Sequence, residues 1–425
     1  MNVLIVTYYW PPAGGSGVQR WLKFVKYLRD FDVEPVIYTV KDPKYAICDE
    51  ELQREIPEGI EILKGPIWEP NNIFSFFGSK SKKTSAGFLN PNPSFFGKIV
   101  QYIRANYFIP DARKYWIKPS VKTLEKYLKH NNIDVLITTG PPHSAHLIGL
   151  KLKKKTGVKW MADFRDPWTE IDYFHQLPLT DSAHKKHHDL EQKVLAKADT
   201  VLVVGNTMRT SFEKFAANVK VIKNGYDTIN SKQEVTLSTK FSLVHVGLLN
   251  SDRNHPVLWQ VLQELCNETP TFRSDLQLKF VGSLAEDVKD AIEAYQLTSV
   301  SEFIEYVPHH TVVQYQQSAQ VLLLPVNNVP SAKGIITGKI FEYLQANRPI
   351  LAIAPVDGDL AEIINETKSG VVVGFDDAKK MKEEVLKMYN DFKQNSLHVA
   401  SENIEKYHRK ELTKKLVEAL KVIGK

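Results

Sequence analysis

Cysteine is nearly absent from this 425-residue chain, which contains only Cys48 and Cys266. The two lie far apart and fit no metal or redox spacing, so we expect buried free thiols in a reducing compartment. Long apolar runs are absent too, and none approaches the roughly 18 residues that a membrane-spanning helix needs. The chain also opens without a basic segment ahead of an apolar stretch. We therefore expect no signal peptide and a cytoplasmic protein.

The excess of positive over negative charge in the chain is small. The formal net charge is +6, with 24% charged and 43% hydrophobic residues, which is ordinary for a globular protein. This excess is too weak to argue for nucleic acid, so we expect no nucleic-acid partner. A chain of 425 residues is too long for one ordinary core, which favours two domains.

Short apolar runs alternate with amphipathic stretches along most of the chain. One series runs from "NVLIV" to "VKVIKNG" and a second from "FSLVHVG" to "SGVVVGF". This alternation predicts an α/β protein with two doubly wound parallel sheets. The polar stretch 224–240 separates the series. We predict an N-terminal Rossmann-like domain at 1–225, a C-terminal one at 226–395, and a final helix at 396–425 that crosses back to the first domain.

One insertion, 65–130, interrupts the alternation. It contains eleven basic and three acidic residues, so its net charge exceeds that of the whole chain. Its aromatic residues are interleaved with the basic ones: Phe74, Phe76, Phe77, Phe88, Phe95, Phe96 and Tyr102. Basic and exposed aromatic residues together suit contact with the inner face of an anionic membrane. Alternatively, the insertion is a loop and a helical hairpin whose aromatics pack on the domain.

The stretch "YYWPPAGGSGVQR" (8–20) joins the first expected strand to a helix and is rich in glycine. Its G-x-G-x-x-R pattern departs from the dinucleotide fingerprint, because Arg20 occupies the place of the last small residue. Gly14 and Gly15 allow close approach of a ligand, and the following helix start offers free N–H groups to an anion. Alternatively, the stretch is a glycine turn that binds nothing.

The segment "AKGIITGKIFEYLQANRP" of the second half carries a stronger signal. Glu342 lies early in an expected helix, where its two carboxylate oxygens match the two vicinal hydroxyls of a ribose. The helix-start amides, including those of Gly334 and Thr337, suit a diphosphate, and Lys333 and Lys339 add positive charge. Arg253 follows the strand "FSLVHVG" and can neutralise a diphosphate leaving group.

Taken in order, these motifs resemble those of the family 4 glycosyltransferases with the GT-B fold. The segments that carry the resemblance extend nearly end to end: "YYWPPAGGSGVQR", "ADTVLVVGNTMR", "VIKNGYD", "HVGLLNSDRN", "VPHHTVVQYQQSAQVLLLP" and "GKIFEYLQANRPILA". The resemblance implies two Rossmann-like domains facing a central cleft. It also implies a retaining, metal-independent hexosyl transfer from a nucleotide diphosphate-sugar to a glycan or lipid-linked acceptor, without a cofactor, in cell-surface polysaccharide synthesis. No D-x-D motif occurs where a metal would be expected.

By position, the resemblance makes Glu342 the ribose ligand and Arg253 the diphosphate ligand, while Gly14 and Gly15 approach the donor from the other domain. Two positions depart from the family. Gly334 stands where the first glutamate of an E-x7-E pair contacts the donor sugar, so Lys333 or backbone amides would replace that contact. Thr138 and Thr139 stand where many members carry a histidine. His143 follows closely. It polarises the sugar or orients the acceptor, or alternatively it only caps the helix start or is a pocket histidine with its own hydrogen-bond partners.

The stretch "ADFRDPW" provides candidate acceptor ligands, because carboxylates and guanidinium groups bind hydroxyls and an aromatic face stacks on sugars. These candidates are Asp163, Arg165, Asp166 and Trp168. Alternatively, an internal Asp–Arg pair only shapes the loop. His184, His187 and His188 have lysines between them, which predicts a solvated helix face rather than a metal site. Two other functions stay open, namely a nucleotide-sugar 2-epimerase of the same fold and a non-catalytic glycan-binding relative.

Overall fold

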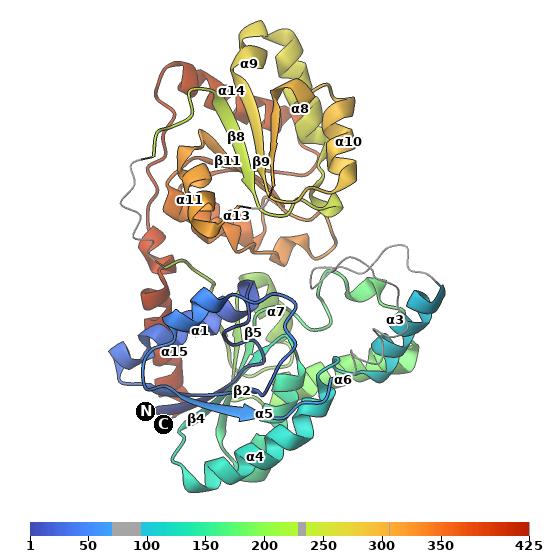
Figure 1. Cartoon of the computed structure of the whole chain (residues 1–425), viewed down its shortest axis with the longest axis vertical. Helices are drawn as coiled ribbons and strands as arrows, with labels where there is room; N and C mark the ends of the chain where they lie inside the picture. The colour runs from blue at the N-terminus through green and yellow to red at the C-terminus, as the bar shows by residue number, and fades with distance from the viewer. Residues whose placement is uncertain (70–94, 228–234, 306, 425) are drawn as a thin grey trace. The chain divides into compact units, whose positions relative to one another are not determined.

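The computed structural model describes residues 1–69, 95–227, 235–305 and 307–424, and it divides into two units (Figure 1). Unit 1 comprises Met1–Asn224 together with Arg409–Lys425, and unit 2 comprises Gly225–His408. Part of the insertion expected to meet a membrane lies outside the described residues, namely Phe74, Phe76, Phe77 and Phe88 with Lys80, Lys82 and Lys83. No helix among the described residues has the length and apolarity to cross a bilayer.

The sheet of unit 1 is parallel throughout, with strand order β3-β2-β1-β4-β5-β6-β7. Its inner strands are almost entirely buried, as expected when helices cover both faces of a parallel sheet. The strands are β1 (Asn2–Val6), β2 (Glu34–Val40), β3 (Glu61–Gly65), β4 (Val135–Gly140), β5 (Lys159–Phe164), β6 (Thr200–Val203) and β7 (Val219–Val221).

The helices of unit 1 other than α3, none of whose residues is buried, place buried residues against the sheet. Val18, Trp21, Leu22 and Val25 form an apolar stripe at helical spacing on α1, and all four are buried. The helices are α1 (Ser16–Leu28), α3 (Phe95–Tyr107), α4 (Ile117–His130), α5 (Ser144–Thr156), α6 (Asp181–Lys197), α7 (Asn206–Phe212) and α15 (Arg409–Ile423).

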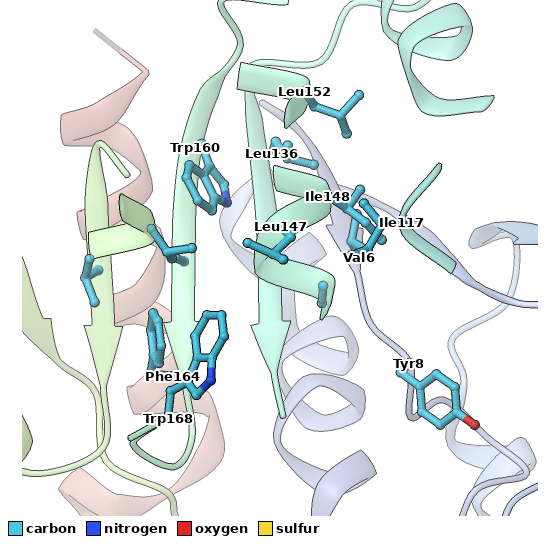
Figure 2. Close-up of a cluster of buried hydrophobic side chains, with 14 of the residues drawn as sticks. Val6, Tyr8, Ile117, Leu136, Leu147, Ile148, Leu152, Trp160, Phe164 and Trp168 are labelled. Carbon is cyan, nitrogen blue, oxygen red and sulfur yellow. The ribbon is translucent and has the colours of Figure 1, made fainter. Parts of the chain in front are cut away.

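The last helix, α15, packs beside α1 within unit 1 (Figure 1). Leu412, Leu416 and Leu420 recur every four residues along α15 and join the buried cluster that includes Trp21. On the other face of the sheet, α4 and α5 cover a second cluster (Figure 2). The chain's final segment therefore completes the core of the unit that its first residues begin.

Unit 2 repeats the plan with the order β10-β9-β8-β11-β12-β13, again all parallel. Its strands are β8 (Phe241–Val246), β9 (Leu276–Val281), β10 (Ser301–Ile304), β11 (Val321–Pro325), β12 (Ile350–Ile353) and β13 (Gly370–Val373). Its helices are α8 (Pro256–Glu268), α9 (Pro270–Asp275), α10 (Glu286–Ala294), α11 (His309–Ser318), α12 (Lys339–Ala346), α13 (Asp359–Thr367) and α14 (Ala378–Lys393).

In both sheets the chain starts in the middle, moves to one edge and then returns to extend the other side. The reversal lies between β1 and β4 in unit 1, and between β8 and β11 in unit 2. Ligands of doubly wound sheets bind outside the carboxyl ends of the strands at such a point. The structure thus confirms two Rossmann-like parallel-sheet domains and directs the search for a site to these two reversals.

Candidate functional site

The reversal in unit 2 brings together the loop after β8 and the segment after β11. Gly247 and Leu248 follow β8 directly, and Asn327 follows β11. Gly247 has φ +93°, which favours glycine, and a Cβ there would come within 2.8 Å of the Lys339 side chain. This glycine therefore lets the Lys339 side chain lie against the backbone at the end of β8.

Arg253 is held over this strand end by two neutral oxygens. Its Nε donates a hydrogen bond to Asn327 Oδ1 at 2.7 Å, and a terminal nitrogen donates to the Leu248 carbonyl at 3.0 Å. A short 3₁₀ turn, Ser251–Arg253, places the residue just before α8. These two contacts fix the direction of the guanidinium at the strand end.

Lys339 opens α12 and reaches the same carbonyl. Its Nζ lies 3.3 Å from the Leu248 oxygen and 3.1 Å from His245 Nε2. Burial, reinforced by the nearby charge of Arg253, lowers the pKa of Lys339 to about 7. The structure therefore brings together two predicted donor-binding residues, Arg253 and Lys339, as two basic groups at one strand end.

The other predicted donor residues of unit 2 lie on the loop and helix around Lys339. Glu342 is in the first turn of α12, and its Oε2 accepts a hydrogen bond from Gln316 Nε2 at 2.9 Å. Lys333 forms an exposed ion pair with Asp357 at 2.6 Å, which opposes a role for it as a free cation.

Gly334 and Thr337 make local backbone bonds. The N–H of Gly334 donates to the Ser331 carbonyl, and the Thr337 carbonyl accepts from the N–H of Ile340. The Gly334 amide is therefore occupied within its own loop, whereas Thr337 contributes its carbonyl to the start of α12.

In unit 1, the glycine-rich loop after β1 is tied down before it enters α1. The N–H of Gly14 donates to the Ile47 carbonyl at 2.9 Å, and a Cβ on Gly14 would come within 2.8 Å of the Ile47 side chain. Gly15 has φ +84°, is exposed, and would have open space around a Cβ. Of the two, Gly15 is therefore the one whose surface is open to a ligand.

Asp163, a predicted acceptor ligand, is instead fully buried at the end of β5. Its carboxylate accepts hydrogen bonds from Arg20, from Trp21 Nε1 at 2.7 Å and from Thr139 Oγ1 at 2.9 Å. Burial alone would raise the pKa of Asp163, but the charge and hydrogen bonds of Arg20, with those of Trp21 and Thr139, hold it below its ordinary value. Asp163 is therefore an internal ion-pair partner, but its arginine is Arg20 of α1 and not one of its own loop.

Arg165 also acts within the unit. Its guanidinium donates to the carbonyls of Gly17, Gly140 and Pro141. It therefore ties the start of α1 to the end of β4, the two segments that flank the chain reversal. Among the predicted acceptor residues, Asp166 is the exposed one.

Trp168 covers His143 rather than presenting a free face to a sugar. The two rings are stacked, with centroids 4.8 Å apart and planes 2° apart. Trp168 is 2% exposed and lies beside Phe164 (Figure 2). His143 occupies the N-cap position of α5, as the capping alternative expects, but its side chain makes no capping hydrogen bond. Burial, with the charges of neighbouring groups, keeps the pKa of His143 well below its ordinary value.

The predicted solvated face of three histidines on α6 is wrong for His187. This residue is buried, and its Nδ1 accepts a hydrogen bond from Trp168 Nε1 at 3.0 Å. His184 is exposed, as expected. Among the described residues, no three histidine, cysteine or acidic side chains gather in a way that would hold a metal ion.

Sequence reasoning missed the neutral groups that hold the charged ones, namely His245, Asn327 and Gln316. His245 is a polar residue inside the apolar strand "FSLVHV", and Asn327 follows the apolar strand "VLLLP". A polar residue in or just after a buried central strand was the available signal for both. Gln316 lies among other polar residues of α11, and nothing in the sequence singled it out.

Comparison with known proteins adds family matches to this geometry. The family model "Glycosyl transferases group 1" matches residues 227–407, and "Glycosyltransferase Family 4" matches residues 84–229. Together the two models span 84–407 without a gap. No curated protein matches the chain.

Solved structures of low sequence identity share the fold. Sucrose-phosphate synthase from Thermosynechococcus elongatus is 13% identical, with TM-score 0.58 and coverage of 100% of this chain and 96% of that one. TarM of S. aureus, solved with fondaparinux, α-GlcNAc-glycerol and UDP, is 12% identical, with TM-score 0.58 and 99% coverage of both chains. UDP-GlcNAc 2-epimerase from Methanocaldococcus jannaschii is also 12% identical, with TM-score 0.52 and coverage of 99% and 100%. An epimerase shares the fold, so the fold alone does not distinguish a glycosyltransferase from an epimerase. The two family models favour the glycosyltransferase.

Proposed function

The chain belongs to the family 4 glycosyltransferases and has the GT-B fold, and from this membership we propose a retaining, metal-independent sugar transfer. The donor would be a nucleotide diphosphate-sugar, bound to unit 2, and the acceptor a glycan or a lipid-linked glycan. The observation that carries the proposal is the meeting of Arg253 and Lys339 at the Leu248 carbonyl. Two basic groups at one strand end suit a diphosphate, whose negative charge increases as the sugar bond breaks.

The proposed donor site uses four side chains. Arg253 and Lys339 bind the diphosphate and stabilise it as the leaving group. Their positive charges offset the negative charge that a metal ion would otherwise neutralise. The Glu342 carboxylate accepts hydrogen bonds from the two ribose hydroxyls, and Gln316 orients this carboxylate. Since Lys333 pairs with Asp357 and the amides of Gly334 and Ile335 bond within their own loop, we assign the donor-sugar contact of the missing glutamate to backbone amides of the 336–338 segment.

On the acceptor side we propose a smaller set of residues than the sequence suggested. Asp166 is exposed and keeps its proposed role as a ligand for acceptor hydroxyls. Asp163, Arg165 and Trp168 act as supports instead, because their polar groups bond within unit 1. His143 remains the proposed catalytic histidine, and Trp168 fixes the plane of its ring.

We further propose that the enzyme acts at the inner face of a membrane in cell-surface polysaccharide synthesis. Helix α3 supports this, because Phe95, Phe96, Ile99 and Tyr102 are all exposed on it. It contains Lys98 and Arg104 and no acidic residue. Exposed aromatic residues together with basic ones are typical of helices that lie in a membrane interface.

Nucleotide-sugar binding tests the donor site. Calorimetry or thermal shift with a panel of nucleotide-sugars should show that Arg253→Ala and Glu342→Ala each weaken binding by about ten-fold or more. Arg273→Ala is the matched control, because Arg273 bonds to Ser299 and the Gln296 carbonyl on the amino-end side of the sheet. Unchanged binding in both site variants would rule out the assignment. Conversion of the donor to an epimer without any acceptor would favour the epimerase instead.

A further inference from the structure

His245 lies 3.1 Å from Lys339 Nζ through its Nε2 and is wholly buried within β8. Its Nδ1 lies 3.1 Å from the Leu323 carbonyl oxygen on the neighbouring strand β11. A carbonyl oxygen only accepts hydrogen bonds, and Nε2 also has one near it, the Leu248 oxygen at 3.4 Å. We assign the hydrogen to Nδ1, because its carbonyl contact is the shorter of the two and because Nε2 has the Lys339 amino group at 3.1 Å as a donor. Burial and the charge of Lys339 keep the pKa of His245 well below its ordinary value, so the ring is neutral.

This assignment fixes the role of the other ring nitrogen. In a neutral imidazole with its hydrogen on Nδ1, Nε2 has only a lone pair. Lys339 Nζ, 3.1 Å away, must therefore donate to His245 Nε2. The Leu248 carbonyl accepts a second hydrogen from Nζ, and the glycine at 247 leaves the space that the side chain occupies.

The contacts that hold Lys339 are thus neutral, and they suit an amine as well as an ammonium. The charged groups that face Lys339 are Arg253, from the loop after β8, and Glu342, from its own helix. Burial and Arg253 disfavour the ammonium form, and together they outweigh Glu342. The site therefore holds a basic group that is only partly charged at neutral pH while no anion is bound.

We propose that His245 is a positioning residue for the diphosphate site and that Lys339 takes up a proton when the anion binds. The Lys339 amine uses its lone pair to bind a proton from the solvent, and the resulting ammonium pairs with the diphosphate. His245 and Leu248 keep Nζ at the strand end in both forms. The inference rests on the proposed function for the identity of the anion, but the titration of Lys339 can be measured without any ligand.

The first experiment uses the free full-length protein. Trace acetylation with acetic anhydride at several pH values, read by mass spectrometry, follows the reactivity of each lysine amine. The reactivity of Lys339 should reach half its maximum near pH 7, with the exposed Lys333 as the reference within the same loop. A midpoint for Lys339 near its ordinary value of 10.5 would overturn the inference whatever the protein binds.

The second experiment measures proton uptake on binding of UDP, GDP and ADP. Calorimetry in two buffers of different ionisation enthalpy should show uptake of a sizeable fraction of one proton at about pH 8, falling toward zero near pH 6. Lys339→Arg keeps its charge, so it should bind with no uptake. Binding by the natural protein without uptake would overturn the inference alone, whereas failure to bind any nucleotide would count against the proposed function.

Variants of His245 test the positioning role. His245→Leu removes the lone pair, so it should lose the uptake and bind about ten-fold more weakly. His245→Gln offers an amide oxygen to Lys339, so it should recover part of the proton uptake and part of the binding affinity. His255→Gln is the matched control, because buried His255 bonds to the Val326 carbonyl instead. Melting temperatures separate general destabilisation from these effects, and unchanged uptake in a folded His245→Leu would reject the role.

Discussion

Arg20 and Asp163 form a buried, two-pronged ion pair between α1 and the end of β5. Arg20 Nε and a terminal nitrogen lie 3.1 and 2.9 Å from the same carboxylate oxygen, and Nε lies 3.3 Å from the other. Another Arg20 nitrogen donates to Asn224 Oδ1 at 3.1 Å. The pair therefore joins the first helix, the central sheet and the residue at which the chain leaves unit 1.

Loss of one partner of this pair should be costly. Arg20→Ala leaves the Asp163 carboxylate buried without its countercharge, which we expect to lower the free energy of unfolding by about 3–5 kcal/mol. The double variant Arg20→Met with Asp163→Leu should lose much less, because no unpaired charge remains. Urea denaturation measures both. Arg29→Ala, which breaks an exposed pair with Glu34, is the control and should change stability by less than about 1 kcal/mol.

Lys339 should reduce stability in the absence of a ligand. Its pKa in the folded state is about 7, below the ordinary 10.5, so folding disfavours its charged form. The resulting cost is fully present below pH 7 and disappears as the pH rises toward 10.5. Lys339→Met should therefore stabilise the free protein by roughly 1–2 kcal/mol near pH 6, with a smaller gain near pH 10, and should weaken nucleotide binding. A destabilised variant near pH 6 would contradict this expectation.

Replacement of His143 should lower the rate of sugar transfer without changing the affinity for the donor. It lies in unit 1, whereas the proposed donor ligands lie in unit 2. His143→Ala should reduce the rate of sugar transfer by about ten- to a hundred-fold and leave nucleotide affinity unchanged. Because burial keeps the pKa of His143 low, its titration should not shape the rate profile between about pH 6 and pH 8. Equal loss of affinity and rate would instead indicate a structural role.

The positions of strands and helices followed from apolar periodicity, and the order of loose motifs predicted the family correctly. The partners of polar side chains did not follow. Arg20 attracted notice only as a break in a glycine fingerprint, and Asp163 as an acceptor ligand or as part of an ion pair within its own loop. Their pairing depends on a separation of 143 residues that local sequence does not encode. His245 was passed over for the same reason, because its partners lie on β11 and α12 rather than beside it in sequence.

Membrane contact through α3 should depend on its exposed aromatic residues. Phe95 and Phe96 are 74% and 67% exposed. Insertion of both rings into a lipid interface would therefore remove more of their apolar surface from water than their packing within the unit does. The double variant Phe95→Ser with Phe96→Ser should bind vesicles of phosphatidylcholine and phosphatidylglycerol at least about ten-fold more weakly in sedimentation assays. Phe215→Ser is the matched control, because Phe215 is also exposed in unit 1 but lies outside α3.

High salt should weaken binding of the natural protein to these vesicles, since Lys98 and Arg104 contribute through attraction to anionic headgroups that salt screens. Binding that survives the loss of both rings, or that is equal on purely zwitterionic vesicles, would remove α3 as the contact surface.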